Sequence, residues 1–242
     1  MAPLFRRKKS FTGLISTTDL HSHLLPGIDD GVQSLEESLE VIMAFKKLGY
    51  TKLITTPHIM YDHYKNDPII INNKLADVRK ALSDNSIDIE IEAAAEYYLD
   101  EYFLDLLNTD KKFLTFGKNY LLFELSFMSK PLILKEAIFM MQTKGFIPVL
   151  AHPERYLYFQ NDLDSLKEIH ENGVLLQLNL LSLSGYYSKP ARKLSNTLIK
   201  ENMISFIGSD CHNLNHLNSL SETLNSSVMN SLLSQNLLNN SI

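Results

Sequence analysis

The chain has 242 residues, of which 45% are hydrophobic and 21% are charged, values typical of a globular protein that can bury a large core. Its formal net charge of −5 repels a phosphate backbone, so nucleic acid is not an expected partner. No apolar run reaches the roughly 18 residues that a membrane span needs. The single cysteine, Cys211, cannot form a disulfide within the chain. We therefore expect a cytoplasmic protein without a membrane span.

The first residues carry the basic run "RRKK", Arg6 to Lys9, with no apolar segment after it. We expect residues 1–16 to form a basic tail and residues 17–242 to form a single domain. The sequence gives no indication of the oligomeric state.

From residue 17 onward, short runs of Ile, Leu and Val alternate with longer amphipathic segments, as in βα units around a parallel sheet. The first helix begins with a capping box, Ser34 and Glu37. Seven strands are predicted, one ending at His23 and the others over 52–58, 87–96, 120–124, 146–152, 174–179 and 204–210. Helices are predicted over 34–49, 68–82, 99–107, 131–144, 162–172, 189–201 and 219–237. Such units form an open doubly wound sheet or a closed barrel, and periodicity alone does not choose between them.

Side chains that can bind a metal ion follow the C-terminal ends of six of these seven strands. Active sites of α/β folds are built at that edge, so we expect the side chains to converge. In "DLHSH" the two-residue period of a strand places both histidines on one side. An aspartate beyond the Pro26–Gly27 turn, Asp30, is added to these side chains. The candidate ligands are therefore His21, His23, Asp30, His58, Glu96, Glu124, His152, Asp210 and His212.

Imidazole nitrogen together with carboxylate oxygen suits manganese, iron or zinc, whereas structural zinc prefers cysteine. Nine ligands are too many for one ion, so we expect two or three ions bridged by carboxylates. Such clusters activate water and hold both oxygens of an in-line displacement, which predicts phosphoester hydrolysis through attack of a metal-bridging hydroxide. Arg155, three residues after His152, fits a phosphate clamp because guanidinium binds phosphate through two hydrogen bonds.

Six motifs, in this order and spacing, resemble the PHP (polymerase and histidinol phosphatase) superfamily of metal-dependent phosphoesterases. They are "DLHSHLLPGIDDG", "TTPH", "AAAEYY", "LFELS", "AHPERY" and "GSDCH". More narrowly, they resemble the bacterial tyrosine-protein phosphatases of capsular and exopolysaccharide loci.

The resemblance implies a distorted (β/α)7 TIM-like barrel with a trinuclear site, usually of manganese. It also implies that all nine candidate residues are ligands, that Arg155 binds the phosphate, and that Asp29 serves the turn or supports a ligand. The implied partner is the phosphorylated tyrosine tail of a membrane-associated tyrosine kinase.

Other functions are alternatives to a tyrosine phosphatase. The same chemistry could act on a small phosphomonoester such as histidinol phosphate, although "IDDG" resembles the protein-phosphatase branch. The acidic chain argues against a nuclease, and the complete ligand set argues against a non-catalytic metal-binding module. A cysteine phosphatase would need an arginine about six residues after its cysteine, so we expect Cys211 to be packed behind the strand ends. His63 is a weak candidate for the general acid.

Overall fold

The computed structural model describes residues 15–232 and 235–242. Its strands form two parallel sheets. The first has the order β1-β2-β4 and consists of β1 (Thr18–Asp19), β2 (Lys52–Thr55) and β4 (Glu90–Ala93). The second has the order β3-β5-β6-β7-β8-β9 and consists of β3 (His58–Ile59), β5 (Glu96–Tyr98), β6 (Tyr120–Glu124), β7 (Ile147–Ala151), β8 (Leu175–Asn179) and β9 (Ile204–Gly208).

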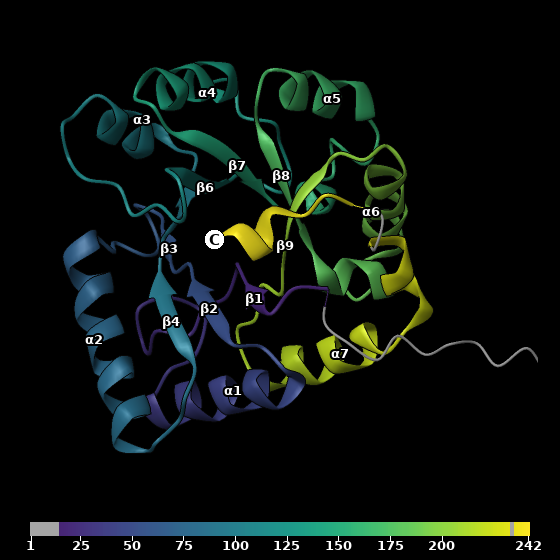
Figure 1. The fold of residues 1–242 in the computed structure, drawn as a ribbon. Coiled ribbons are helices and arrows are strands. Elements are labelled where there is room, and N and C mark those ends of the chain that lie inside the picture. Colours follow the sequence, from purple (N-terminus) through teal and green to yellow (C-terminus); the bar gives the residue numbers. More distant parts are fainter. Residues whose placement is uncertain (1–14, 233–234) are drawn as a thin grey trace, which may run out of the picture.

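The helices form an outer layer around the strands (Figure 1). They are α1 (Leu35–Leu48), α2 (Pro68–Asp84), α3 (Glu101–Leu107), α4 (Leu134–Thr143), α5 (Leu163–Glu171), α6 (Lys189–Lys200) and α7 (Leu214–Leu224). Short 3-10 helices are η1 (Pro153–Arg155), η2 (Leu180–Ser184), η3 (Ser227–Leu232) and η4 (Leu238–Ser241). The protein is therefore an α/β fold, and an isolated parallel bridge between Ser22 and Cys211 connects the segments that follow β1 and β9.

Two of the predicted strands are each divided between the sheets. The run 52–58 gives β2 in the first sheet and β3 in the second, because Pro57 has no N–H to donate to a ladder. The run 87–96 likewise gives β4 and then β5. The described residues therefore contain nine strands instead of the predicted seven.

The prediction of a last helix over 219–237 was wrong in its bounds. Asn213 caps α7 through its side chain, which accepts the His216 N–H, so the helix begins at Leu214. It ends at Leu224, where the Ser226 hydroxyl donates to the Thr223 carbonyl, a side-chain bond that competes with helix continuation. The predicted Ser34 cap of α1 is confirmed, since the Ser34 side chain accepts the Glu37 N–H.

A small hydrophobic cluster lies beneath the strand ends and positions the candidate site. Leu122 belongs to this cluster, and Glu124 follows it by two residues in β6, so both side chains face the same side of the sheet. Leu238 and Ile242, at the end of the chain, also pack against this cluster. The larger core lies under the helices and includes the fully buried Phe45 of α1, whose burial stabilises the fold by about 2 kcal/mol.

Residues 1–14 of the predicted basic tail lie outside the described residues. Ser16, near the end of the predicted tail, is buried and its hydroxyl donates to the Thr18 carbonyl. Within the described part of the chain, no helix is both long and apolar enough to cross a membrane.

Candidate metal centre

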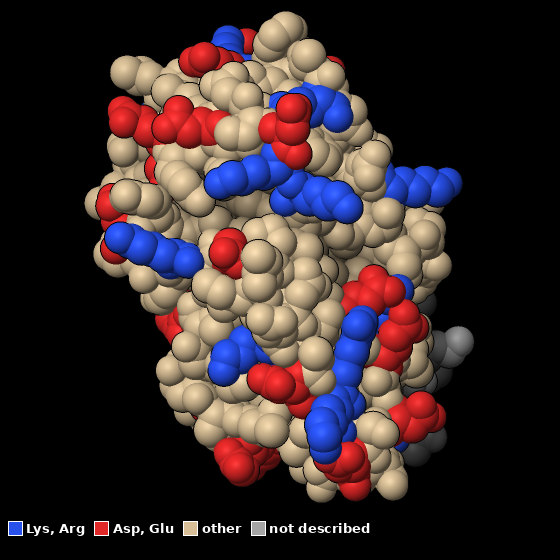
Figure 2. Space-filling view, turned by 90° about the vertical axis from the view of Figure 1, so that its left-hand side faces the viewer, with Lys and Arg blue, Asp and Glu red and all other residues tan. Residues whose placement is uncertain are grey.

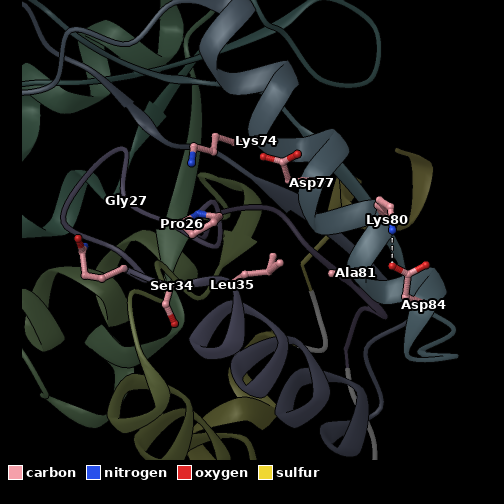
Figure 3. Close-up of a pocket in the computed structure, with 10 residues that line it drawn as sticks. Pro26, Gly27, Ser34, Leu35, Lys74, Asp77, Lys80, Ala81 and Asp84 are labelled. Atoms are coloured by element: carbon pink, nitrogen blue, oxygen red, sulfur yellow. Dashed lines mark hydrogen bonds and ion pairs between the residues drawn. The ribbon is translucent and has the colours of Figure 1, made fainter.

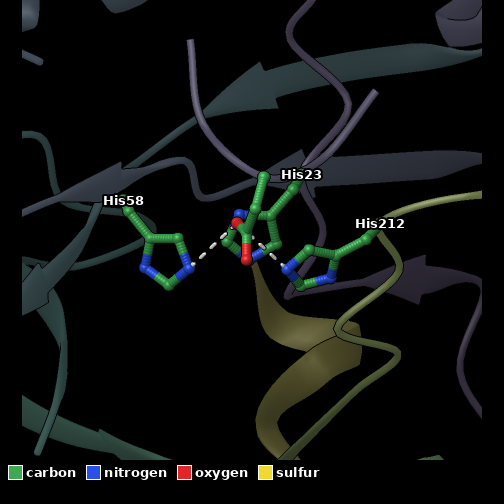
Figure 4. A group of neighbouring side chains, drawn as sticks. His23, His58 and His212 are labelled. Carbon is green, nitrogen blue, oxygen red and sulfur yellow. Dashed lines mark ion pairs between the residues drawn. The ribbon is translucent and has the colours of Figure 1, made fainter. Parts of the chain in front are cut away.

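The structure brings all nine candidate ligands together. They form four overlapping groups, and within each group the possible ligand atoms lie within 4.8 Å of one another. The groups are His23, Asp30, His58 and His212; His21, His23 and Glu96; His21, His152 and Asp210; and His58, Glu96 and Glu124. Figure 4 shows three of these imidazoles, from three separate segments of the chain, gathered around one carboxylate.

Glu96 lies at the centre of these groups and is fully buried. Its Oε2 is 3.1 Å from Nε2 of His21, 3.3 Å from Nδ1 of His58 and 3.5 Å from Nε2 of His23. Its Oε1 is 3.0 Å from Nε2 of His152. A carboxylate that faces four imidazoles through both oxygens could hold a metal ion together with these rings.

Asp210 has a similar arrangement next to Glu96. Its Oδ1 lies 3.4 Å from Nε2 of both His21 and His23. Asp210 therefore also contacts two different imidazoles of the cluster.

Three histidines use Nδ1 for a hydrogen bond that directs Nε2 into the cluster. His21 donates from Nδ1 to Oε1 of Gln177 at 2.9 Å, and His23 donates from Nδ1 to Oδ2 of Asp29 at 2.8 Å. His212 donates from Nδ1 to the Asp210 carbonyl at 2.9 Å. Since these acceptors have no proton to give, each Nδ1 carries the donated hydrogen, and Nε2 is the nitrogen that can bind a metal once it has lost its own proton.

Two buried ring nitrogens fit a metal directly. Nε2 of His23 and Nδ1 of His58 have no hydrogen-bond partner among the described residues, although unsatisfied buried polar atoms destabilise a fold. Nδ1 of His58 instead faces Glu96 at 3.3 Å and Glu124 at 3.0 Å. The donor set of imidazoles and carboxylates therefore suits borderline or hard divalent ions.

The local backbone holds these ligands tightly. A Cβ added to Gly31 would lie 2.2 Å from the carbonyl oxygen of His23, and a Cβ added to Gly208 would lie 2.6 Å from Cβ of His21. Any larger residue at these two glycines would displace a histidine of the cluster. His152 and Asp210 have φ values of 33° and 51°, a left-handed conformation that non-glycine residues rarely adopt outside functional sites.

The protein without metal keeps protons on this cluster. Burial lowers the pKa of His58, but the charges of Glu96 and Glu124 outweigh burial and raise that pKa to about 9. Burial raises the pKa of Asp30, but its hydrogen bond with His212 and nearby histidine charges lower it to about 2. Metal binding must displace such imidazole protons, so the affinity for metal should rise with pH.

Arg155 projects from η1, directly after β7, toward the cluster. Its Nη1 donates to Oδ2 of Asp210 at 2.5 Å. The side chain is 22% exposed, so its other guanidinium N–H groups can be reached by a ligand. Nδ2 of Asn179 donates to the same Asp210 oxygen at 3.0 Å.

Other expectations can be compared with the structure. Asp29 accepts hydrogen bonds from the candidate ligand His23 and from the Gly31 N–H. Cys211 is buried behind the strand ends, and burial raises the pKa of its thiol well above the usual value. His63 is exposed and belongs to none of the four candidate metal groups.

The sequence did not predict the polar residues that orient the candidate ligands. Gln177 and Asn179 lie in β8 and are fully buried. A signal for them was present, because "VLLQLN" places two amides in an otherwise apolar strand. The rings of Phe127 and Tyr187, which lie on Arg155, have no comparable signal in the sequence.

Two further cavities of the described structure lie apart from the metal-capable residues. One of about 430 Å³ is formed between the start of α1 and α2, with Ser34, Leu35 and Lys74 in its lining (Figure 3). Another of about 460 Å³ lies beside α2 and α3, and its lining combines apolar side chains with Asn66, Asp67, Lys111 and Lys112. On the face of the molecule that carries these two helices, acidic and basic side chains are interspersed (Figure 2).

Comparison with known proteins places the chain in a family. The model of the capsular polysaccharide synthesis family CpsB/CapC matches residues 17–232. The tyrosine-protein phosphatase YwqE of Bacillus subtilis is 32% identical over 197 residues, which cover 81% of this chain and 77% of that protein. The putative tyrosine-protein phosphatase CapC of Staphylococcus aureus is 29% identical over 196 residues, which cover 81% of this chain and 77% of that protein.

A solved structure is similar over nearly its whole length. It comes from the crystal structures of YwqE from Bacillus subtilis and CpsB from Streptococcus pneumoniae, described as unique metal-dependent tyrosine phosphatases. The TM-score is 0.77 at 28% identity, over 91% of this chain and 96% of that chain. The chain thus belongs to the CpsB/CapC family of capsular polysaccharide synthesis proteins.

Proposed function

We propose that this protein is a metal-dependent phosphoric monoester hydrolase that removes phosphate from phosphotyrosine in proteins of capsule or exopolysaccharide synthesis. The observation that carries the proposal is the convergence of nine imidazole and carboxylate side chains, Glu96 and Asp210 among them, with Arg155 beside them. Relatives in the same family are named tyrosine-protein phosphatases.

The proposed fold is one distorted (β/α)7 TIM-like barrel, in which the two parallel sheets are arcs of a single wall. The Ser22–Cys211 bridge supports it, because it links the segments that follow β1 and β9. In this arrangement residues 17–242 form one domain and residues 1–16 a basic tail.

The proposed ligands of two or three ions are the nine residues of the four groups. Manganese is the first candidate, and iron and zinc suit the same donors. Three divalent ions with four carboxylates, Asp30, Glu96, Glu124 and Asp210, leave a charge of +6 − 4 = +2, which attracts a phosphate dianion. When bound, the ions supply an activated water and Lewis acidity toward phosphorus.

The protein's own residues position the substrate and the ligands. Arg155 keeps one donor on Asp210 and offers the rest of its guanidinium to the phosphate oxygens. Gln177 and Asp29 fix the orientation of His21 and His23, so Nε2 of each histidine points into the site before any ligand arrives.

The proposed partner is the phosphorylated tyrosine tail of a membrane-associated tyrosine kinase, which the protein would bind in the cytoplasm. A small phosphomonoester such as histidinol phosphate is the second candidate, because the metal groups and one arginine do not identify the leaving group.

The test compares hydrolysis of three substrates by the manganese-loaded protein. They are a phosphotyrosyl peptide, histidinol phosphate and a short single-stranded oligonucleotide. We expect kcat/KM to be at least about tenfold higher for the peptide, a difference of roughly 1.4 kcal/mol in transition-state binding. A higher value for histidinol phosphate would overturn the assignment of the substrate.

A matched pair of histidine variants separates the site from the rest of the surface. His58→Ala removes a candidate ligand and should abolish hydrolysis of the peptide. His170→Ala removes a histidine of α5 outside the candidate metal groups and should retain hydrolysis. Equal loss in both variants would show that the assay reports folding instead of the site.

A further inference from the structure

The guanidinium of Arg155 lies against two aromatic rings. Its central carbon is 4.7 Å from the ring centroid of Phe127 and 4.1 Å from that of Tyr187. Together with the ion pair to Asp210, the two rings fix the position of the cation, since guanidinium stacks favourably on aromatic faces.

The two rings differ in what else they do. The Tyr187 hydroxyl accepts a hydrogen bond from Nδ2 of Asn179 at 2.9 Å, and the same amide group donates to Asp210. Tyr187 is thereby tied to the residues that hold the cluster. Phe127 has no polar atom on its ring, and 38% of the residue is exposed.

Phe127 is held firmly despite this exposure. Its ring stacks on His152 with a centroid distance of 5.7 Å and an interplanar angle of 23°, and it lies 5.5 Å from the ring of Tyr156. Its carbonyl accepts the Leu157 N–H at 3.1 Å. The loop after β6 therefore presents a rigid aromatic surface next to Arg155 and next to a candidate metal ligand.

The apolar surface continues outward from this ring. Met128, the next residue, and Leu157, bonded to Phe127 through the backbone, are both exposed. Keeping large apolar side chains in water is unfavourable, so such a surface at the edge of a site marks a contact for a ligand.

We propose that Phe127 is the specificity-determining residue of the site and contacts the aromatic ring of the phosphotyrosine. The inference rests on the proposed function, because the phosphate must lie between Arg155 and the candidate metal ligands. A phosphate held there places its ester oxygen and leaving group next to the exposed part of Phe127. A flat aryl group can stack on that ring, whereas the alkyl chain of phosphoserine cannot cover it.

The size of the effect follows from the contact. Partial burial of an aryl ring combined with an aromatic pair is worth about tenfold in affinity. Loss of Phe127 also loosens Arg155, but that change weakens every phosphate ligand alike. The ratio of aryl to alkyl affinity therefore isolates the ring contact.

The experiment measures binding of phenylphosphonate, methylphosphonate and inorganic phosphate to the manganese-loaded protein by calorimetry, without turnover. In the unmodified protein we expect phenylphosphonate to bind about ten times more tightly than methylphosphonate. Phe127→Ala should bring this ratio close to one, and Phe127→Tyr, which retains the ring, should preserve it. Phe127→Leu is a second variant without the aromatic ring. It keeps an apolar side chain and should give an intermediate ratio of the two affinities.

Tyr187→Phe is the matched control at the second ring that contacts Arg155. It keeps the ring over the guanidinium and should leave the ratio unchanged. If Phe127→Ala keeps the full preference while inorganic phosphate still binds, the inference is wrong and the proposed function stands. If the loaded protein binds neither inorganic phosphate nor either phosphonate, the proposed function itself fails.

Discussion

Asp29 offers the sharpest test of how the site is preorganised. Its Oδ2 accepts the His23 Nδ1–H at 2.8 Å and the His58 N–H at 3.2 Å, while Oδ1 accepts the Gly31 N–H at 2.9 Å. The substitution Asp29→Asn keeps the size and shape of the side chain. However, it replaces one acceptor oxygen by an NH2 group and removes the negative charge.

The structure indicates which contact is lost. If the amide oxygen stays near His23 and His58, the NH2 group faces the Gly31 N–H, and two donors oppose each other. The remaining bond to His23 is also weaker, because the acceptor no longer carries a charge. Loss of such a partner behind a metal-bound histidine lowers metal affinity about 10- to 100-fold, which corresponds to roughly 1.4–2.7 kcal/mol.

The assay is competition for Mn²⁺ against a chelator of known affinity. Asp67→Asn is the matched control, because Asp67 is an exposed N-cap of α2 that accepts the Ile69 and Ile70 N–H groups and asparagine caps a helix equally well. We expect the control to bind metal as the unmodified protein does. An Asp29→Asn affinity within twofold of the unmodified protein would refute the supporting role of Asp29.

The remaining predictions concern three other buried or partly buried residues. Arg155→Ala should weaken phosphate binding about 10- to 100-fold with the metal content by elemental analysis unchanged, and normal phosphate affinity would contradict the clamp. Gln177→Leu leaves Nδ1–H of His21 without its acceptor and should cost about 1–3 kcal/mol in urea unfolding; an unchanged midpoint would count against this bond. Burial raises the pKa of Glu154 to about 7, so the folded chain binds this proton more tightly than the unfolded chain. That contribution to stability is complete below about pH 4.5 and is lost as the pH rises through 7, by up to about 3 kcal/mol. In protein freed of metal by a chelator, Glu154→Gln should reduce the decrease in the free energy of unfolding with rising pH. An unchanged pH profile would argue against this role of Glu154.

The candidate ligands could be found from the sequence because their signal is local. His58 and Glu124 each lie at the end of an apolar run, and parallel strands bring such ends to one edge. The distance between residues far apart in the chain, such as His21 and Glu96, then follows from the fold. The positions of the motifs at the strand ends were therefore sufficient to predict which side chains come together.

The supporting residues could not be assigned in the same way. Whether the amide of Gln177 meets His21 depends on the register of β8 beside its neighbours, and no pattern in a single strand encodes that register. The division of the 52–58 run between two sheets depends on tertiary pairing as well as on Pro57. In the last helix, the regular leucines suggested a length that the Asn213 cap and the Ser226 hydroxyl bond do not allow.

The most direct test of the central claim is the number of metal ions per chain, measured together with hydrolysis of a phosphotyrosyl peptide. We expect two to three ions per chain after loading with manganese, loss of hydrolysis when a chelator removes them, and recovery when manganese is returned. Glu96→Gln should lower the number of bound ions, because Glu96 faces four imidazoles of the cluster. Full hydrolysis in excess chelator, with no metal bound, would contradict the account.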